Sequence, residues 1–167
     1  VYATIASDPD ADEIKWSAPF KIGYDVMLNK PLVLSSGEWL FPVAVWDKNV
    51  FSLRDVRSGH RDREAFVYKS VDNGKSFKRI GGAVAKDRSF DEHMLVEKTD
   101  GSIEMYIRTH YGIASSRSYD GGYNWTTPRD SGLKGPDSRF FIGRLKSGRL
   151  LLLNHYNFTG RNNLTAM

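Results

Sequence analysis

The sequence predicts an all-β fold built from repeated four-stranded units. Three observations lead to this prediction: a turn motif that occurs twice, an apolar hairpin pattern that occurs three times, and strands without a helical period. Four-stranded units that recur about every 40–50 residues are typical of β-propeller blades. We therefore expect a β-propeller, of which this chain contains about three four-stranded blades.

The repeated turn motif reads Ser-x-Asp-x-Gly-x-x-aromatic. Its first copy is "SVDNGKSF", residues 70–77, and its second copy is "SYDGGYNW", residues 118–125. The short Asp side chain accepts backbone hydrogen bonds across a turn, and the glycine supplies a positive φ angle. The aromatic ring is expected to cover the hairpin. We therefore assign a structural role to the residues of the motif, Ser70, Asp72, Gly74, Phe77, Ser118, Asp120, Gly122 and Trp125.

The second repeated element is an apolar strand, a tight turn that ends in glycine, and another apolar strand. It appears as "LVLSSGEWLFPVAVW" around Gly37, as "MLVEKTDGSIEMYIR" around Gly101 and as "FIGRLKSGRLLLLNHY" around Gly148. These strands are rich in Val, Ile, Leu and aromatic residues, which favour β-structure. The interval between the first two copies is longer because of an extra polar stretch, residues 47–63.

The two repeats together divide the chain into units of a single propeller domain. Residues 28–86 form a blade with the turn motif at 70–77, residues 87–136 form a blade with the motif at 118–125, and residues 137–167 form an incomplete blade. Residues 1–27 are predicted to be the end of a preceding, degenerate blade. Since an open propeller exposes sheet edges, we expect the remaining blades of the same propeller, or a partner chain, to close it.

The composition argues against several classes of protein. The net charge of +4 is spread over 167 residues with acidic side chains interspersed, which argues against a dedicated nucleic-acid surface. No apolar run reaches membrane-spanning length, so we expect no membrane insertion. The chain has no cysteine and its four histidines match no compact zinc motif, so we expect neither a metal nor another cofactor. The start at Val1 is compatible with a removed leader, and we expect a secreted, periplasmic or lysosomal-type location.

The turn motif resembles the Asp-box, or BNR repeat, of sialidases. Because two copies occur in register with the hairpin pattern, the chain is similar to the sialidase superfamily from about residue 28 to residue 167. The resemblance implies a six-bladed propeller that binds its ligand on the face opposite the Asp-boxes. It therefore implies that this chain is a fragment, and that the nucleophile lies beyond Met167. Asp-boxes also occur in other glycosidases and in non-enzymatic propellers.

The resemblance also implies a set of substrate-binding residues. Arg108, at the end of "SIEMYIR", resembles one arginine of the sialidase carboxylate clamp, and such a guanidinium binds a carboxylate bidentately. Asn29, with Lys30 beside it, stands where sialidases carry another arginine of the clamp. This departure leaves other sugars open, neutral ones included. The expected substrate-binding residues are Arg108, Lys30, Asn29, His93, His110, Tyr111 and Arg139, whereas Arg161 resembles a structural position.

Three carboxylates are candidates for catalysis under the same resemblance. Glu92, in "DEHMLVEKTDG", falls where sialidases place the glutamate that activates a nucleophilic tyrosine. Glu64 lies six residues before Ser70, which is the spacing of the sialidase general acid, and Asp62 is two residues away. A general acid needs a raised pKa. The alternative is that "SGHRDRE" is a charged loop without a catalytic role.

The predicted function is that of a sialidase-like, exo-acting glycoside hydrolase that removes terminal sugars, sialic acid among them, from glycans. Hydrolysis with retention of configuration follows if the sialidase chemistry holds. One alternative is a non-catalytic Asp-box propeller that binds glycan or protein with the same face. Another is a propeller glycosidase or lyase for a different sugar, in which His93 or His110 would be the catalytic histidine.

Overall fold

The computed structural model describes residues 1–46 and 64–167. The extra polar stretch at 47–63, and with it Asp62, lies outside the described residues. The described part of the chain forms strands and turns, and contains no helix that could cross a membrane.

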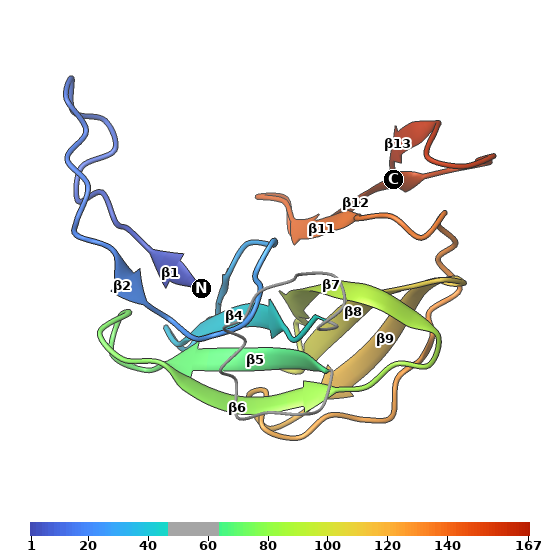
Figure 1. Ribbon diagram of the computed structural model, residues 1–167, viewed down its shortest axis with the longest axis horizontal. Helices are drawn as coiled ribbons and strands as arrows, with labels where there is room; N and C mark the ends of the chain where they lie inside the picture. Colours follow the sequence, from blue (N-terminus) through green and yellow to red (C-terminus); the bar gives the residue numbers. More distant parts are fainter. Residues whose placement is uncertain (47–63) are drawn as a thin grey trace.

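The strands form four antiparallel sheets that follow one another along the chain (Figure 1). The first sheet pairs β1 (Tyr2–Ala3) with β2 (Phe20–Lys21). The second sheet has the order β3 (Leu32–Val33), β4 (Trp39–Ala44), β5 (Ala65–Ser70) and β6 (Lys78–Ala83). The third contains β7 (Arg88–Glu97), β8 (Ile103–Thr109), β9 (Gly112–Ser118) and β10 (Arg129–Asp130). The fourth contains β11 (Phe141–Arg144), β12 (Leu150–His155) and β13 (Leu164–Ala166).

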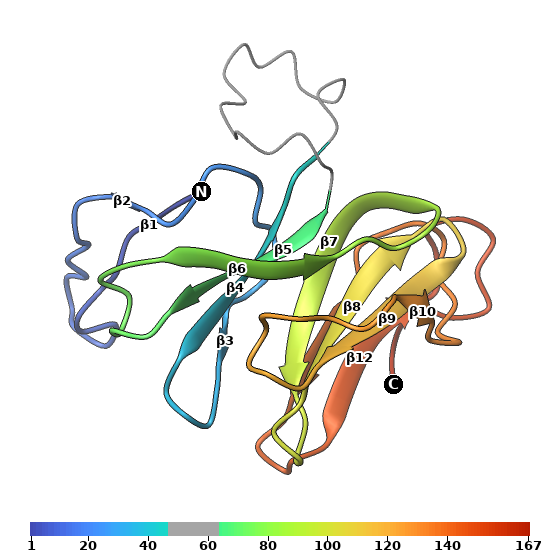
Figure 2. The ribbon, with the colours of Figure 1, turned by 90° about the horizontal axis from the view of Figure 1, so that it is seen from below.

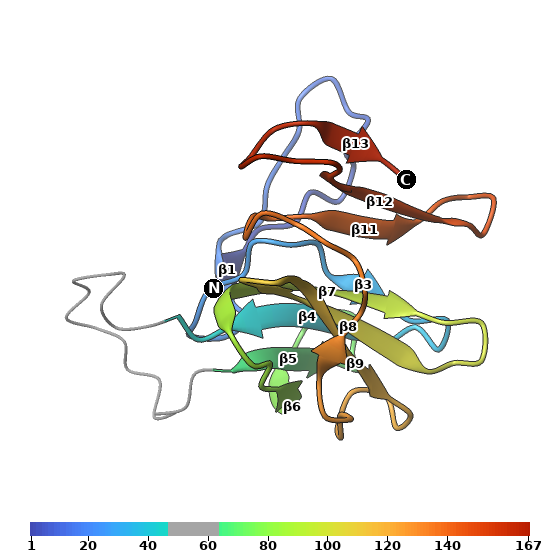
Figure 3. The same cartoon turned by 90° about the vertical axis from the view of Figure 1, so that its right-hand side faces the viewer.

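Each sheet is a meander whose neighbouring strands are consecutive in sequence, as in propeller blades. The β3–β6 sheet and the β7–β10 sheet lie side by side, and the β11–β13 sheet follows beyond β7 (Figures 2 and 3). A groove of about 360 Å³ lies between the innermost strands β3, β7 and β11. The predicted all-β architecture of four-stranded blades is confirmed.

Apolar side chains fill the spaces between neighbouring sheets. Leu40, Val67 and Met105 are fully buried in the cluster between the second and third sheets. Met94 and Ile142 belong to a second cluster, between the third and fourth sheets. Full burial of such a side chain stabilises the fold by about 1.5–3 kcal/mol. The hydrophobic runs of the sequence therefore hold successive blades together.

The two Asp-box turns have nearly identical hydrogen bonds. In both, the serine hydroxyl donates to the aspartate Oδ1 over 2.8 Å and accepts the glycine N–H over 2.9 Å. Bonds from Ser76, the largest of them from its hydroxyl, lower the pKa of Asp72 to about 2. Bonds from Asn124, above all from its backbone N–H, lower the pKa of Asp120 to about 2. Each carboxylate is thus the centre of its own turn.

The Asp-box aromatics and the second Asp-box turn connect neighbouring blades. The ring of Phe77 stacks on that of Phe20 in the first sheet, with 5.9 Å between the ring centres, and Trp125 packs against the core between the second and third sheets. The second turn also lies directly on β6. A Cβ atom added to Gly81 would be 2.7 Å from the carbonyl oxygen of Gly122, and nearer still to that of Tyr123. Only glycine fits at this approach.

The Asp-boxes lie at one end of the sheets. In β9, Gly112 pairs with Thr109 at one end and Ser118, the first residue of the Asp-box, pairs with Ile103 at the other. A seven-residue strand is about 20 Å long. Asp120 is therefore separated from Arg108 by the length of a strand, and Asp72 follows β5 in the equivalent way.

Candidate functional site

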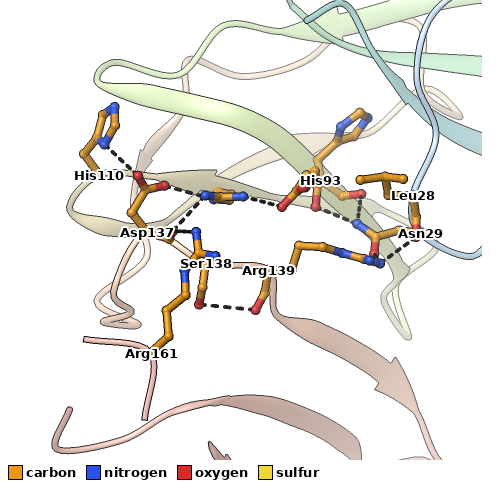
Figure 4. A network of polar contacts seen from close by, with 10 residues as sticks. Leu28, Asn29, His93, His110, Asp137, Ser138, Arg139 and Arg161 are labelled. Carbon is orange, nitrogen blue, oxygen red and sulfur yellow. Dashed lines mark hydrogen bonds and ion pairs between the residues drawn. The ribbon is translucent and has the colours of Figure 1, made fainter. Parts of the chain in front are cut away.

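The candidate site lies at the end of the sheets opposite the Asp-boxes. The end of β8, the start of β7 and the segments that precede β3 and β11 bring polar side chains together there (Figure 4). The resulting network includes Asn29, Glu92, Arg108, His110, Asp137, Arg139 and Arg161.

Arg108 is at the centre of this network and is only 4% exposed. Its Nη1 donates to Oε2 of Glu92 over 2.6 Å, and its Nε donates to Oδ1 of Asp137 over 2.9 Å. Its Nη2 donates to the backbone carbonyl of Asp137 over 2.7 Å. A guanidinium has five N–H donors, so these bonds use three of them. Arg108 is therefore held between two carboxylates, and its guanidinium carbon lies 5.0 Å from the centre of the Phe90 ring.

Glu92 reaches Arg108 because β7 is bulged. The pairing of β7 with β8 shifts register between Arg88 and Asp91 and again between Asp91 and Met94. Asp91 and Glu92 both have positive φ angles, 63° and 36°. Residues other than glycine in this region cost on the order of 1–3 kcal/mol each. Such bulges redirect side chains near functional sites, and this one directs Glu92 to Arg108.

The same bulge turns His93 into the interior, where it is 1% exposed. Its Nε2 lies 2.7 Å from the carbonyl oxygen of Phe66 in β5, so the ring donates its N–H there. Burial lowers the pKa of His93 to about 4. His93 is therefore a neutral residue between two blades. Its ring is buried in this structure, and its expected contact with substrate stays a prediction.

Asn29 connects three segments of the chain. Its Nδ2 donates to the backbone carbonyls of Glu92 and His93, over 2.6 and 3.0 Å. Its Oδ1 accepts a hydrogen bond from Nη2 of Arg139 over 3.1 Å. The same nitrogen of Arg139 also donates to the carbonyl of Leu28 over 2.6 Å. The structure thus brings together Asn29, Glu92 and Arg139, which the sequence had placed in different blades.

Asp137 and Arg161 belong to the network, although neither was predicted as a site residue. Asp137 accepts from Arg108 through Oδ1, and its Oδ2 lies 2.9 Å from Nδ1 of His110. Its backbone carbonyl accepts a second bond from Arg161, over 3.2 Å. Asp137 precedes the innermost strand β11 just as Asn29 precedes β3. This equivalent position in the repeat is the sequence signal from which Asp137 could have been predicted as a site residue. Arg161 had been set aside as a structural residue.

The remaining predicted residues lie around the network. Glu64 precedes β5, and its Oε2 is 3.5 Å from Nη2 of Arg79. The Lys30 ammonium is 6.0 Å from the centre of the Phe141 ring and lines the groove between the innermost strands. Tyr111 packs against the core between the second and third sheets, and burial raises its pKa. Tyr111 is partly buried, and its expected contact with substrate stays a prediction.

The network carries an excess of positive charge. Among the residues that the structure describes, the network joins three guanidinium groups, those of Arg108, Arg139 and Arg161, with two carboxylates, those of Glu92 and Asp137. Arg139 and Arg161 are exposed. An ionised carboxylate on a ligand would balance this excess, and guanidinium groups suit it because of their planar donor geometry. Within residues 1–46 and 64–167, no group of acidic or histidine side chains has the arrangement of a metal site.

The sequence profile of a family described as the BNR repeat-like domain matches residues 5–167. A search of curated proteins found no match.

Solved structures with the same fold include a Dyadobacter fermentans protein of unknown function, the Hadza microbial sialidase Hz136 and the Trypanosoma rangeli sialidase. Their sequence identities to this chain are 19%, 18% and 18%, and their TM-scores are 0.69, 0.68 and 0.57. The matches cover 99%, 99% and 96% of this chain, but only 54%, 34% and 28% of the other chains. These likenesses establish the fold and confirm the resemblance to sialidase-like propellers.

Proposed function

Because this chain belongs to the BNR repeat-like domain family, we propose that it is part of a sialidase-like glycoside hydrolase acting on terminal sugars that carry a carboxylate. The observation that carries this proposal is the convergence of Arg108, Arg139 and Arg161 at one end of the sheets. They come from three separate segments, and their charge exceeds that of the carboxylates around them. The sialidases among the similar structures agree with this reading.

Two of the arginines are the proposed contacts of the sugar carboxylate. Arg139 and Arg161 are exposed and are fixed to the network by Nη2 alone. Their remaining N–H groups suit a carboxylate, and each charge-assisted bond contributes about 1.5–3 kcal/mol. Arg108 is nearly buried, so its proposed part is to hold Glu92 and Asp137 in place.

The proposed catalytic groups are Glu92 and Glu64. Glu92 is 8% exposed and is held by Arg108 at the end of the sheets opposite the Asp-boxes, and it is the proposed general base for a nucleophile. Glu64, at the start of β5 on the same end of the sheets, is the proposed general acid, with Asp62 as the alternative. The nucleophile is not assigned to a residue of this chain.

The test uses the protein at its natural length with three sets of glycosides: sialosides, uronic acid glycosides and neutral glycosides. Turnover and direct binding are measured for the wild type, Glu92→Gln and Glu64→Gln. Glu104→Gln is the matched control, because Glu104 forms an ion pair of 2.6 Å with Arg117, the same length as that of Glu92 with Arg108. We expect turnover of a carboxylated glycoside, and a fall in kcat of about 100-fold or more for Glu92→Gln and Glu64→Gln.

Two results would contradict this proposal in different ways. Binding of glycans without turnover, unchanged by Glu92→Gln and Glu64→Gln, would replace the hydrolase with a non-catalytic binding propeller. Turnover restricted to neutral glycosides would show that the arginine cluster does not recognise a substrate carboxylate.

A further inference from the structure

Arg108 and Arg139 differ sharply in the freedom of their guanidinium groups. Arg108 is 4% exposed and makes three hydrogen bonds through three different nitrogens. Arg139 is exposed, and both of its hydrogen bonds leave from Nη2. Within the described residues, its Nε and Nη1 carry no hydrogen bond to the protein. Arg139 is therefore fixed through Nη2 alone within the described residues, and the three N–H groups of Nε and Nη1 remain available to bind a ligand.

The side chain of Asn29 is what connects this anchored arginine to Glu92. An asparagine amide has two N–H donors and one carbonyl acceptor. In Asn29 the donors bind the carbonyls of Glu92 and His93, and the acceptor binds Arg139. The partners lie 63, 64 and 110 residues away in sequence. One amide thus holds two parts of the site at a fixed separation.

The donors of Asn29 act on the strained part of β7. Asp91 and Glu92 have positive φ angles, which persist only where surrounding contacts hold them. Asn29 binds the two carbonyls that follow this strain, and the buried ring of His93 binds Phe66 on the side of the neighbouring blade. The bulge is therefore held by Asn29 on one side and by the bond of His93 to Phe66 on the other. Of these two, Asn29 is the one that also contacts Arg139.

We propose that Asn29 is the positioning residue of this site, coupling the carboxylate-binding guanidinium of Arg139 to the bulge that presents Glu92. This inference rests on the proposed function and adds to it the source of specificity. Arg139 meets the carboxylate of the sugar, and Asn29 fixes where that carboxylate lies relative to Glu92. Asn29 itself touches neither the sugar nor the reacting atoms.

Two substitutions at this position test the two roles. Asn29→Ala removes all three hydrogen bonds, so both Arg139 and the bulge lose their support. Asn29→Asp keeps an acceptor for Arg139 but replaces the donor nitrogen by an oxygen that faces the carbonyls of Glu92 and His93. The Asp variant therefore disrupts the bulge and retains the anchor of Arg139. Asn73→Asp, in the first Asp-box turn at the opposite end of the sheet, is the control for the change in charge.

The binding experiment uses two pairs of ligands, N-acetylneuraminic acid with its methyl ester and glucuronic acid with its methyl ester, on the protein at its natural length. In each pair the ester lacks the charge of the acid and carries one additional methyl group. We expect the wild type to prefer one acid over its ester by about tenfold or more, the effect of a single charge-assisted contact. This preference should fall towards unity in Asn29→Ala and remain in Asn73→Asp. It should also fall in Asn29→Asp, because the new carboxylate competes with that of the ligand for Arg139.

Turnover and hydrogen exchange test the second role. For both Asn29 variants we expect kcat to fall at least tenfold and KM to rise, because each variant disturbs the bulge and weakens the contact of Arg139 with the sugar carboxylate. Hydrogen exchange of residues 88–97 should become faster in both Asn29 variants and stay unchanged in Asn73→Asp. The exchange measurement needs no ligand and no activity.

The outcomes distinguish this inference from the proposed function. If the wild type does not discriminate acid from ester in either pair, the proposed carboxylate recognition fails, and hydrogen exchange alone then decides whether Asn29 holds the bulge. If the wild type discriminates but Asn29→Ala retains the full preference and normal exchange in β7, the proposed function stands and the role of Asn29 is wrong.

Discussion

Glu92 and Arg108 form an ion pair of 2.6 Å in which both side chains are almost completely buried. Removing one partner of a buried pair leaves an uncompensated charge, which costs far more than the pair itself contributes. The Arg108 guanidinium also serves Asp137, so its removal would leave two carboxylates facing each other. Experiments on Arg108 therefore report on folding as well as on ligand binding.

Replacement of Arg108 by alanine should lower the free energy of unfolding by about 3–5 kcal/mol, the usual cost of breaking a buried ion pair. Arg117→Ala should cost less, because the side chain of Arg117 is 32% exposed, whereas that of Arg108 is 5% exposed. Urea titration of both variants checks this expectation. A loss below about 1 kcal/mol for Arg108→Ala would mean that the network is looser than described.

Acid should destabilise the protein through its Asp-boxes. The folded-state pKa of both Asp72 and Asp120 is lowered to about 2 from 3.8. The unfolded chain therefore binds more protons than the native state in this range, and the stability contributed above pH 4 is lost as the pH falls towards 2. We expect Asp72→Asn and Asp120→Asn to be less stable at neutral pH and to show a shallower decline between pH 4 and pH 2, measured by urea titration at each pH.

His93 should contribute a second, separate pH dependence. Burial lowers its pKa to about 4 in the native state from 6.5, so the unfolded chain binds an extra proton between these values. Stability should be complete above pH 6.5 and should fall by up to about 3 kcal/mol as the pH decreases to 4. His93→Gln, whose amide can still donate to Phe66, should remove this slope. A slope that persists in His93→Gln would assign the effect to another group.

The parts of the fold that depend on local patterns could be predicted from the sequence. The Asp-boxes are defined by residues within four positions of Asp72 and Asp120, so the motif itself contains nearly all the interacting groups. The hairpins around Gly37, Gly101 and Gly148 were equally visible, since each glycine has a positive φ angle between two apolar strands.

The candidate site was harder to predict because its contacts are distant in sequence. Asn29 and Arg139 are 110 residues apart, and no pattern in either segment indicates the other. The positive φ angles of Asp91 and Glu92 could not be anticipated either, because only a few per cent of non-glycine residues adopt them and no turn motif marks this position. Asp91, Glu92 and His93 are all buried, and the register shifts of this bulge decide that Glu92 points to Arg108 while His93 points to Phe66.

Gly81→Ala should destabilise the protein although it adds only one methyl group. The atoms that the new Cβ would meet are the carbonyls of Gly122 and Tyr123, and a backbone cannot rotate away as a side chain can. We expect a loss of about 3 kcal/mol, the upper part of the range for overpacking, in denaturant titration.

Trp125→Ala, which removes a half-buried ring at the same boundary, should lower the free energy of unfolding by about 2–3 kcal/mol, less than the loss of a fully buried aromatic ring. The same denaturant titration measures this change.

The contact at Gly81 also determines how such a protein can grow or be recombined. Gly81 belongs to the sheet of residues 32–83, whereas the turn that rests on it belongs to the next sheet. A gene segment cut at the edges of one sheet would therefore separate a turn from the glycine that accommodates it. A segment that keeps this contact begins in the outer strand of one blade and ends in the outer strand of the following blade. The unit suited to duplication or exchange therefore has different boundaries from the four-stranded sheet.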